Sequence, residues 1–291
     1  MKSSPTAPVV TRFAPSPTGR LHLGHAFSAI RAHDFARARG GCFLLRIEDI
    51  DPGRSREAYI DGIEEDLRWL GLAWDGAVVR QSARLDAYAS ALDRLKGEGL
   101  VYPCFCTRAE IAASAAAPHG SGGPAYPGTC RLLPAAARAA RMAAEPHCWR
   151  LDMTAATARA GRLYWRDDVA GLVTATPEPQ GDVVLARKDA PVSYHLAVTV
   201  DDAAQGVTDI VRGVDLFEAT HVHRLLQALL GLPTPSYHHH PLLLGADGKR
   251  LAKRGGALAL ADLRAAGVAP AGLAAELRAG RMPVGFGLAG E

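Results

Sequence analysis

A strand, a turn and a helix start follow one another within the first 25 residues, and this order limits the fold more than any other feature. Residues 9–13 are an apolar run typical of a β-strand, and residues 14–19 contain two prolines and a glycine, which predict a turn. An amphipathic segment then begins at Leu21. In nucleotide-binding α/β sheets, phosphate groups bind where a strand leads through a loop into a helix N-terminus. The sequence therefore predicts an α/β fold with a phosphate site near residue 22.

Two histidines stand at this helix start, in the sequence His22-Leu23-Gly24-His25. Side chains three residues apart lie on one face of a helix, so both imidazoles can donate hydrogen bonds to phosphate oxygens. Gly24 has no side chain, which lets a flat base or a ribose approach the backbone. The alternative interpretation is two unrelated surface histidines, because this spacing often occurs by chance.

A basic segment lies far downstream, at residues 245–256. It has glycines on both sides and places four cations within six positions: Lys249, Arg250, Lys253 and Arg254. Such a segment predicts a loop that closes on a polyanion. A solvated surface or a nucleic-acid contact is the alternative interpretation.

These two segments together resemble the HIGH and KMSKS motifs of class I aminoacyl-tRNA synthetases. Four further segments resemble the catalytic domain of the glutamyl-tRNA synthetases and occur in the order of that family: residues 12–19, 45–51, 69–75 and 211–213. The resemblance covers most of residues 9–258. It implies an α/β fold with a Rossmann-like parallel sheet and helices on both faces, interrupted by an inserted zinc-containing α+β subdomain.

The composition is that of an ordinary globular protein and excludes several other classes. Hydrophobic residues make up 48% of the 291 positions and charged residues 22%, and no apolar run approaches the ~20 residues that a membrane span needs. The N-terminus has no apolar core of signal-peptide length, and the odd number of cysteines, five, does not form a disulfide framework. We therefore expect a cytoplasmic protein with no membrane partner. The net charge of +3 permits nucleic-acid binding without requiring it.

The expected elements indicate a catalytic core with an insertion. Residues 42–49 predict a buried strand with charges at its carboxyl end, and helical spacing marks residues 54–70 and 82–95. The composition changes near residue 101, and the sheet pattern resumes with an expected strand at 194–200. The expected domains are a first catalytic half at 1–100, an inserted zinc-binding subdomain at 101–190, a second catalytic half at 191–258 and a short helical tail at 259–291.

Three cysteines near the start of the insertion predict a metal site: Cys104, Cys106 and Cys130. Soft ligands brought together by short loops suit tetrahedral Zn²⁺, which usually takes four. The resemblance implies that Tyr126 is the fourth ligand through its phenolate, although His119 or Cys148 could serve instead. Four protein ligands leave no position for a catalytic water, so we expect one structural Zn²⁺. The alternative is a set of ordinary buried cysteines.

The resemblance implies that the amino acid is glutamate, whose two carboxylates and one ammonium require a pocket with two cationic groups and at least one anion. Arg12 and Arg212 stand at strand ends in the two halves, and either can bind a carboxylate through two hydrogen bonds, while Glu48 can take the ammonium. Which arginine holds the γ-carboxylate stays open. The resemblance adds hydroxyl contacts from Ser16 and Tyr194. The motif around Arg12 completes the expected glutamate-binding set with Phe13, Ala14 and Pro15.

The resemblance also implies how ATP, bound with Mg²⁺, is used. The α-carboxylate of glutamate attacks the α-phosphorus, and the expected catalytic residues are His22, His25 and Lys253. The expected ATP-binding residues are His22, Gly24, His25, Arg250 and Lys253. The basic segment departs from the family at Arg250, which keeps the charge of the lysine it replaces, and at Ala252, which lacks the usual serine hydroxyl.

Two features indicate which branch of the family the chain resembles. Few residues follow Arg254, so we expect no anticodon-binding domain, and Val198 stands where enzymes that charge tRNA(Glu) typically have asparagine. With the Cys/Tyr pattern, these features resemble the glutamyl-queuosine tRNA(Asp) synthetases. This resemblance implies that a monomer activates L-glutamate without tRNA and transfers it to the queuosine base in the anticodon loop of tRNA(Asp). The alternatives are a truncated glutamyl-tRNA synthetase charging the 3′ end of tRNA(Glu), a small-molecule nucleotidyltransferase and a non-catalytic RNA-binding relative.

Overall fold

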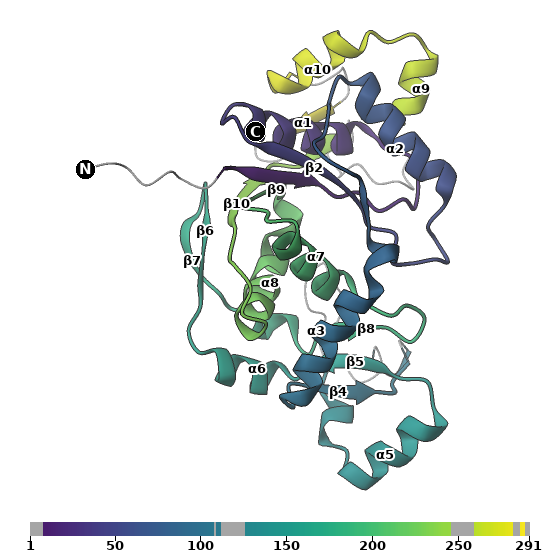
Figure 1. Ribbon diagram of the computed structural model, residues 1–291, viewed down its shortest axis with the longest axis vertical. Coiled ribbons are helices and arrows are strands. Elements are labelled where there is room, and N and C mark those ends of the chain that lie inside the picture. Colours follow the sequence, from purple (N-terminus) through teal and green to yellow (C-terminus); the bar gives the residue numbers. More distant parts are fainter. Residues whose placement is uncertain (1–7, 108, 112–125, 246–258, 282–285, 289–291) are drawn as a thin grey trace, which may run out of the picture.

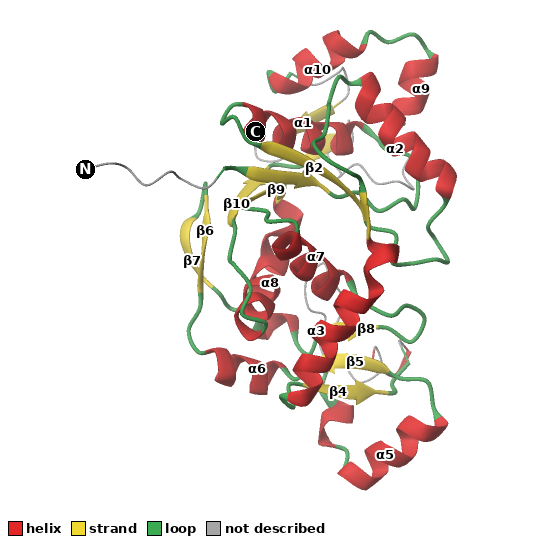
Figure 2. Cartoon of the chain, in the orientation of Figure 1, coloured by secondary structure: helices red, strands yellow, loops and turns green. Residues whose placement is uncertain are grey.

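The computed structural model describes residues 8–107, 109–111, 126–245, 259–281 and 286–288. The described chain is elongated, with the N-terminal strands toward one end and residues 135–151 toward the other (Figure 1). Helices cover the central strands on both sides (Figure 2). None of the helices in these residues has the length and apolarity that a membrane span requires.

The first half of the chain forms a parallel three-stranded sheet. Its strands are β1 (Val10–Phe13), β2 (Cys42–Ile47) and β3 (Val79–Arg80), with β2 in the centre. Two helices alternate with them, α1 (Leu23–Arg37) and α2 (Glu57–Trp69). The apolar side chains of β2 are mostly buried, as expected for a parallel strand covered on both faces. The strand expected at 42–49 and the helix expected at 54–70 are confirmed.

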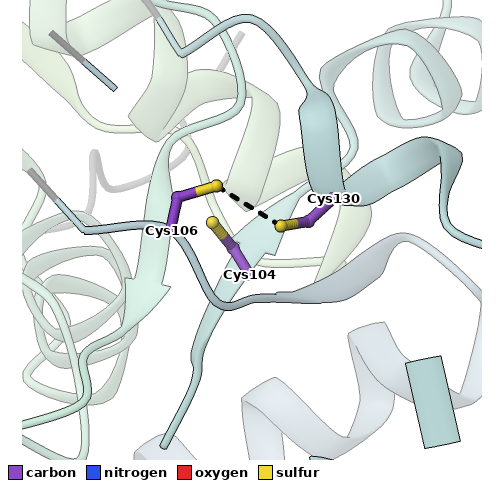
Figure 3. A group of neighbouring side chains, drawn as sticks. All are labelled: Cys104, Cys106 and Cys130. Atoms are coloured by element: carbon purple, nitrogen blue, oxygen red, sulfur yellow. Dashed lines mark hydrogen bonds between the residues drawn. The ribbon is translucent and has the colours of Figure 1, made fainter. Parts of the chain in front are cut away.

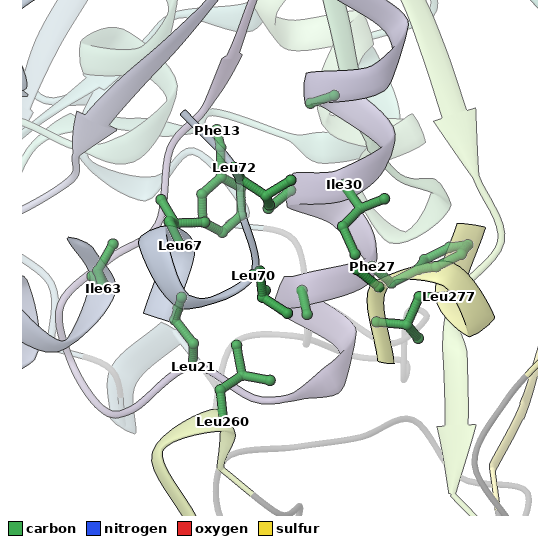
Figure 4. Close-up of a cluster of buried hydrophobic side chains, with 14 of the residues drawn as sticks. Phe13, Leu21, Phe27, Ile30, Ile63, Leu67, Leu70, Leu72, Leu260 and Leu277 are labelled. Carbon is green, nitrogen blue, oxygen red and sulfur yellow. The ribbon is translucent and has the colours of Figure 1, made fainter. Parts of the chain in front are cut away.

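A hydrophobic core lies between this sheet and its helices. Figure 4 shows part of it, including Phe13, Phe27, Ile63, Leu260 and Leu277. The last two residues belong to α9 (Leu260–Ala265) and α10 (Pro270–Arg278), which pack on α2 and α1 respectively. Complete burial of one such leucine contributes about 2 kcal/mol, so these contacts hold both helices against the first half.

The second half adds a four-stranded sheet in the order β7-β6-β10-β9. β9 (Asp209–Gly213) and β10 (Ser236–His240) are parallel neighbours and are connected by α8 (Phe217–Leu229). β9 also lies beside β1, because the Thr208 amide donates to the Val10 carbonyl at 3.0 Å. The two sheets therefore meet along β1 and β9.

Residues 101–190 form a small antiparallel sheet and a hairpin. The sheet contains β4 (Val101–Cys104), β5 (Cys148–Leu151) and β8 (Val184–Ala186), and the described helices of this segment include α5 (Ala135–Ala144) and α6 (Met153–Ala160). The hairpin contains β6 (Tyr164–Asp167) and β7 (Gly171–Thr174). β6 pairs in parallel with β10, so this hairpin belongs to the sheet of the second half. The segment expected as an insertion thus supplies strands to two sheets.

One expected strand is wrong, because residues 194–200 lie in a helix, α7 (Tyr194–Ala204). α7 packs between α8 and α3 (Leu85–Gly97), and its buried residues include six consecutive or nearly consecutive positions. A helix buried on most sides has no continuous polar stripe, so periodicity cannot separate it from a buried strand. The helix expected at 82–95 is confirmed as α3 and the 3₁₀ turn before it.

The remaining elements are short. β11 (Leu243–Gly245) pairs antiparallel with β12 (Phe286–Leu288). The 3₁₀ turns lie at Gln81–Arg84, Thr129–Leu132, Glu178–Gln180 and Val214–Leu216.

Candidate active site

A cavity of about 520 Å³ lies where the carboxyl ends of β1, β2, β9 and β10 meet the N-terminus of α1. This edge of an open α/β sheet is where ligands bind. The predicted glutamate and nucleotide residues within the described part of the chain all line it: Arg12, Phe13, Ala14, Pro15, Ser16, His22, Gly24, His25, Glu48, Tyr194 and Arg212. Arg250 and Lys253 lie outside the described residues.

The two histidines at the start of α1 cap the helix with their rings. The Gly24 amide donates to His22 Nδ1, and the His22 amide donates to His25 Nδ1, each at 3.1 Å. A neutral imidazole that accepts at Nδ1 carries its proton on Nε2, so each ring is a donor at that nitrogen. A Cβ at position 24 would lie 3.0 Å from the His22 ring, so this site favours glycine.

Arg12, at the end of β1, is held by a buried carboxylate. Its Nε donates to Asp202 Oδ1 at 2.9 Å, and Arg46 Nη1 donates to the same oxygen at 2.8 Å. Arg46 Nη2 also reaches Glu48 Oε1 at 3.4 Å. Burial opposes the ionisation of Asp202, but the two guanidinium groups hold its pKa below the usual value, whereas burial raises the pKa of Glu48. The charge of Arg12 is therefore matched by a carboxylate of the protein.

Arg212, at the end of β9, is held by neutral groups instead. Its Nε donates to His239 Nε2 at 3.2 Å, and its Nη2 donates to Thr220 Oγ1 at 2.6 Å. Its Nη1 lies 3.4 Å from His223 Nδ1 and donates to the Tyr194 hydroxyl at 3.5 Å. Although Arg212 is only 4% exposed, no carboxylate among the described residues forms an ion pair with it. Its charge is therefore available to a ligand in the cavity.

The residues that support these two arginines were not predicted from the sequence. Asp202, His223 and His239 are buried behind the cavity wall and belong to none of the recognised motifs. One pattern could have indicated Asp202: the acidic pair Asp201-Asp202 ends an apolar run, and buried carboxylates require partners. No comparable sequence pattern indicated His223 or His239.

Figure 3 shows three cysteine side chains that converge near the end of β4. The Sγ atoms of Cys104, Cys106 and Cys130 all lie within 4.8 Å of one another, and those of Cys106 and Cys130 are 3.5 Å apart. The Tyr126 hydroxyl accepts a hydrogen bond from the Cys130 amide at 2.8 Å and lies 3.6 Å from Cys106 Sγ. Sulfurs bound tetrahedrally to Zn²⁺ at about 2.3 Å stand about 3.8 Å apart, so the cluster has the size of a zinc site.

A further cysteine, Cys148, contacts the cluster from β5, where it lies opposite Cys104. A hydrogen bond with Cys148 lowers the pKa of the Cys104 thiol to about 4, and Arg150 acts in the same direction. Burial and the neighbouring thiols raise the pKa of Tyr126 above its usual value. Tyr126 contacts both Cys106 and Cys130 and is close enough to be the fourth donor, whereas Cys148 contacts Cys104 and does not belong to the group of sulfurs within 4.8 Å of one another. His119 lies outside the described residues.

The chain matches a known protein family. Residues 8–284 match the family described as "tRNA synthetases class I (E and Q), catalytic domain". The chain therefore belongs to this family of class I tRNA synthetases, and it is an enzyme of the ligase type.

Within the family, the chain is similar to proteins named glutamyl-Q tRNA(Asp) synthetase. It is 52% identical over 273 residues to that of Rhodobacter capsulatus, covering 90% of this chain and 97% of the relative. It is 48% identical over 270 residues to that of Symbiobacterium thermophilum, covering 89% and 82%. A glutamate tRNA ligase from Elizabethkingia meningosepticum, solved in complex with its amino acid, has a TM-score of 0.71 and 30% identity, covering 86% of this chain and 52% of that one. The chain spans about half the length of that solved protein.

Proposed function

We propose that the enzyme activates L-glutamate with ATP and Mg²⁺, without tRNA, and transfers the glutamyl group to the queuosine base in the anticodon loop of tRNA(Asp). The observation that carries the proposal is the single cavity that two arginines, Glu48 and two helix-capping histidines share. The name of the relatives, glutamyl-Q tRNA(Asp) synthetase, supports the choice of acceptor.

Glutamate suits the cavity because the charges are complementary. Arg12 and Arg46 share the carboxylate of Asp202, and Arg46 also lies 3.4 Å from Glu48, whereas Arg212 forms no ion pair with a carboxylate of the described residues. Arg212 is therefore the surplus cation of the pocket. The surplus cation matches the net negative charge of glutamate, whereas the neutral glutamine would leave it unpaired. Arg12 and Arg212 bind the two carboxylates, and Glu48 accepts the ammonium. The pocket wall is completed by Phe13, Ala14, Pro15, Ser16 and Tyr194.

The residues at the start of α1 bind the phosphate groups of ATP. A carboxylate oxygen of glutamate attacks the α-phosphorus, the bond from this phosphorus to its bridging oxygen breaks, and pyrophosphate leaves with the electron pair. The Nε2–H groups of His22 and His25 donate to phosphate oxygens as their charge grows, and the helix dipole favours the same charge. Gly24 lets the nucleotide approach the backbone. Arg250 and Lys253 neutralise the pyrophosphate, together with the Mg²⁺ that accompanies ATP.

The second step transfers the activated group. A hydroxyl of the queuosine cyclopentene ring attacks the glutamyl carbonyl carbon, and the carbonyl–phosphate bond breaks. AMP leaves, and the hydroxyl proton passes to one of its phosphate oxygens. Because both steps depend on position and charge, the enzyme needs no covalent nucleophile.

A structural Zn²⁺ is part of the proposal. Three thiolates and one phenolate would hold it: Cys104, Cys106, Cys130 and Tyr126. The bound ion would supply cross-linking between the end of β4 and the 3₁₀ turn at Thr129–Leu132, which contains Cys130. Because four protein ligands fill a tetrahedral site, no position remains for a reacting water.

Two assays test the proposed function. Purified enzyme should catalyse ATP–pyrophosphate exchange with L-glutamate in the absence of tRNA. With radioactive glutamate, label should attach to queuosine-containing tRNA(Asp) and should stay on the anticodon fragment after nuclease digestion. Queuosine-free tRNA(Asp) is the control and should remain unlabelled. Label on the 3′-terminal adenosine of tRNA(Glu) would instead identify an ordinary tRNA-charging activity and refute the proposed acceptor.

The basic segment has its own test. Lys253→Ala should lower the rate of pyrophosphate exchange on the order of 10²–10³-fold, the scale for removal of one preorganised charge donor. Lys249→Ala, in the same segment but without an assigned role, should retain most of the activity. Full activity in the Lys253 variant would rule out the role assigned to this lysine.

A further inference from the structure

Arg212 and Arg12 are oriented by different kinds of group. Arg12 shares a carboxylate with Arg46, whereas Arg212 is surrounded by two imidazoles, two hydroxyls and a backbone carbonyl. A guanidinium group has only N–H donors, so an imidazole nitrogen that faces it must be unprotonated to accept a hydrogen bond. The orientation of Arg212 therefore depends on which nitrogen of each ring carries the proton.

Asp167 determines which nitrogen of the His239 ring carries the proton. Its Oδ2 accepts a hydrogen bond from His239 Nδ1 at 2.7 Å, so the ring proton is on Nδ1, and Nε2 remains an acceptor for Arg212. Its Oδ1 accepts from the amides of Val169 and Ala170 at 3.0 and 2.9 Å. Asp167 and His239 are both buried, and neither lines the cavity. They act on a ligand only through Arg212.

His223 faces another part of the guanidinium group. Its Nδ1 lies 3.4 Å from Arg212 Nη1, and its Nε2 lies 3.2 Å from His195 Nδ1. Burial and the charge of Arg212 lower the pKa of all the histidines in this group, to about 4 for His195 and His239. These rings are therefore neutral at neutral pH.

We infer that His239 and His223 are positioning residues that form a neutral clamp on Arg212, with Asp167 fixing the tautomer of His239. A carboxylate in place of either ring would also orient Arg212, but it would neutralise the guanidinium group that gives the pocket its uncompensated positive charge. Neutral nitrogens orient the guanidinium and leave this charge uncompensated. The effect on glutamate rests on the proposed function of Arg212.

Asp167→Asn tests the clamp without altering Arg212 or the cavity. Two amides hold Oδ1, so the new NH₂ group faces His239 Nδ1 as a donor. The ring proton then moves to Nε2 and points at Arg212. We expect the KM for glutamate in pyrophosphate exchange to rise about 10-fold or more, with kcat and the KM for ATP within about twofold of wild type. Asp168→Asn changes an exposed neighbouring carboxylate and should behave like wild type.

Two substitutions of the ring separate positioning from packing. His239→Leu removes the acceptor and should raise the KM for glutamate as Asp167→Asn does. His239→Gln offers a carbonyl oxygen near the position of Nε2 and should restore most of the affinity. Nitrogen-15 NMR of the histidine rings provides a readout independent of activity: His239 Nε2 should be unprotonated in the wild type and protonated in Asp167→Asn.

The inference is overturned if wild-type His239 carries its proton on Nε2, or if Asp167→Asn moves the proton and leaves the KM for glutamate unchanged. A wild-type enzyme without glutamate-dependent exchange would refute the proposed function instead. In that case the NMR measurement still decides whether the neutral clamp exists.

Discussion

At the scale of single residues, Asp202 shows how much of the site depends on one carboxylate. It accepts hydrogen bonds from both Arg12 and Arg46, and all three side chains are buried. Asp202→Asn would leave the buried Arg12 without its counter-charge and would remove one of the carboxylates around Arg46, which keeps Glu48 at 3.4 Å and Asp201 at 3.9 Å. We expect a loss of about 3 kcal/mol in the free energy of unfolding, measured by urea denaturation, and a higher KM for glutamate because Arg12 loses its orientation.

The control for this change is an exposed ion pair. Asp93 accepts from Lys96 at 2.9 Å on the surface of α3, and Asp93→Asn should alter stability by less than about 1 kcal/mol. If both variants unfolded at the same urea concentration, the Asp202 network would not be the stabilising feature described above.

The two arginines and Glu48 in the cavity wall could be predicted from the sequence, whereas the contacts of the residues behind them could not. Arg12, Glu48 and Arg212 stand in short motifs at strand ends, where α/β sheets bind ligands. Asp202 comes from a helix 190 positions away from Arg12, and His239 from a strand 27 positions after Arg212. Their contacts arise only when separate elements pack, and a single sequence contains no record of that packing.

At the scale of elements, the contact of α2 with α9 includes a buried carboxylate with an unusual pKa. Asp66 of α2 lies 3.3 Å from Arg264 of α9, and burial raises the pKa of Asp66 to about 6. The pKa of this carboxyl group is about 3.9 in the unfolded state and higher in the folded state. Its contribution to stability is therefore complete at a pH below about 3.9 and is lost as the pH rises through about 6. Asp66→Asn, which is always neutral, should therefore gain in melting temperature relative to wild type between pH 5 and pH 7.5.

An exposed carboxylate on the same helix controls for this measurement. Asp61 lies on the solvent side of α2. The difference in melting temperature between Asp61→Asn and wild type should therefore be the same at both pH values. If the difference in melting temperature between Asp66→Asn and wild type did not change with pH, the raised pKa of the buried Asp66 would be contradicted.

The cysteine cluster leads to a second prediction at this scale. The purified protein should contain about one zinc per chain, and Cys104→Ser should lose the metal and melt at a lower temperature, because metal binding contributes directly to folding. Cys42 is exposed at the start of β2 and does not belong to the cluster, so Cys42→Ser should keep both the metal and the melting temperature. Metal-free protein, with identical melting in the two variants, would disprove the zinc assignment.

Elements with a clear pattern were predictable, and those without one were not. α2 and α3 alternate apolar and charged positions at helical spacing because each has one buried face. α7 has no such pattern, since α3 and α8 cover it, and its residues Tyr194–Val200 were therefore expected in a strand. The hairpin of β6 and β7 was expected within an insertion, and its pairing with β10 depends on a long-range contact.

At the scale of the whole molecule, the cavity lies on the line where the two sheets meet. Its wall takes Arg12 and Glu48 from one half and Arg212 from the other. A ligand that binds both halves must stabilise them as one unit, and at 100 times its dissociation constant the gain is about 2.7 kcal/mol. L-Glutamate should therefore raise the melting temperature, and L-glutamine at the same concentration should not. Equal shifts with the two amino acids would contradict the charge argument.

The pairing of β6 with β10 has a consequence for how this chain can be shortened or recombined. The segment between residues 101 and 190 begins and ends near the core and is a natural target for replacement by a short linker or by the corresponding segment of a relative. Replacement by a short linker would remove Asp167, which holds His239 against Arg212, and a segment from a relative would have to supply an aspartate at the same position. The exchangeable unit is therefore smaller than the sequence boundaries indicate: it contains the cysteine cluster and the sheet of β4, β5 and β8, and it must leave the β6–β7 hairpin in place.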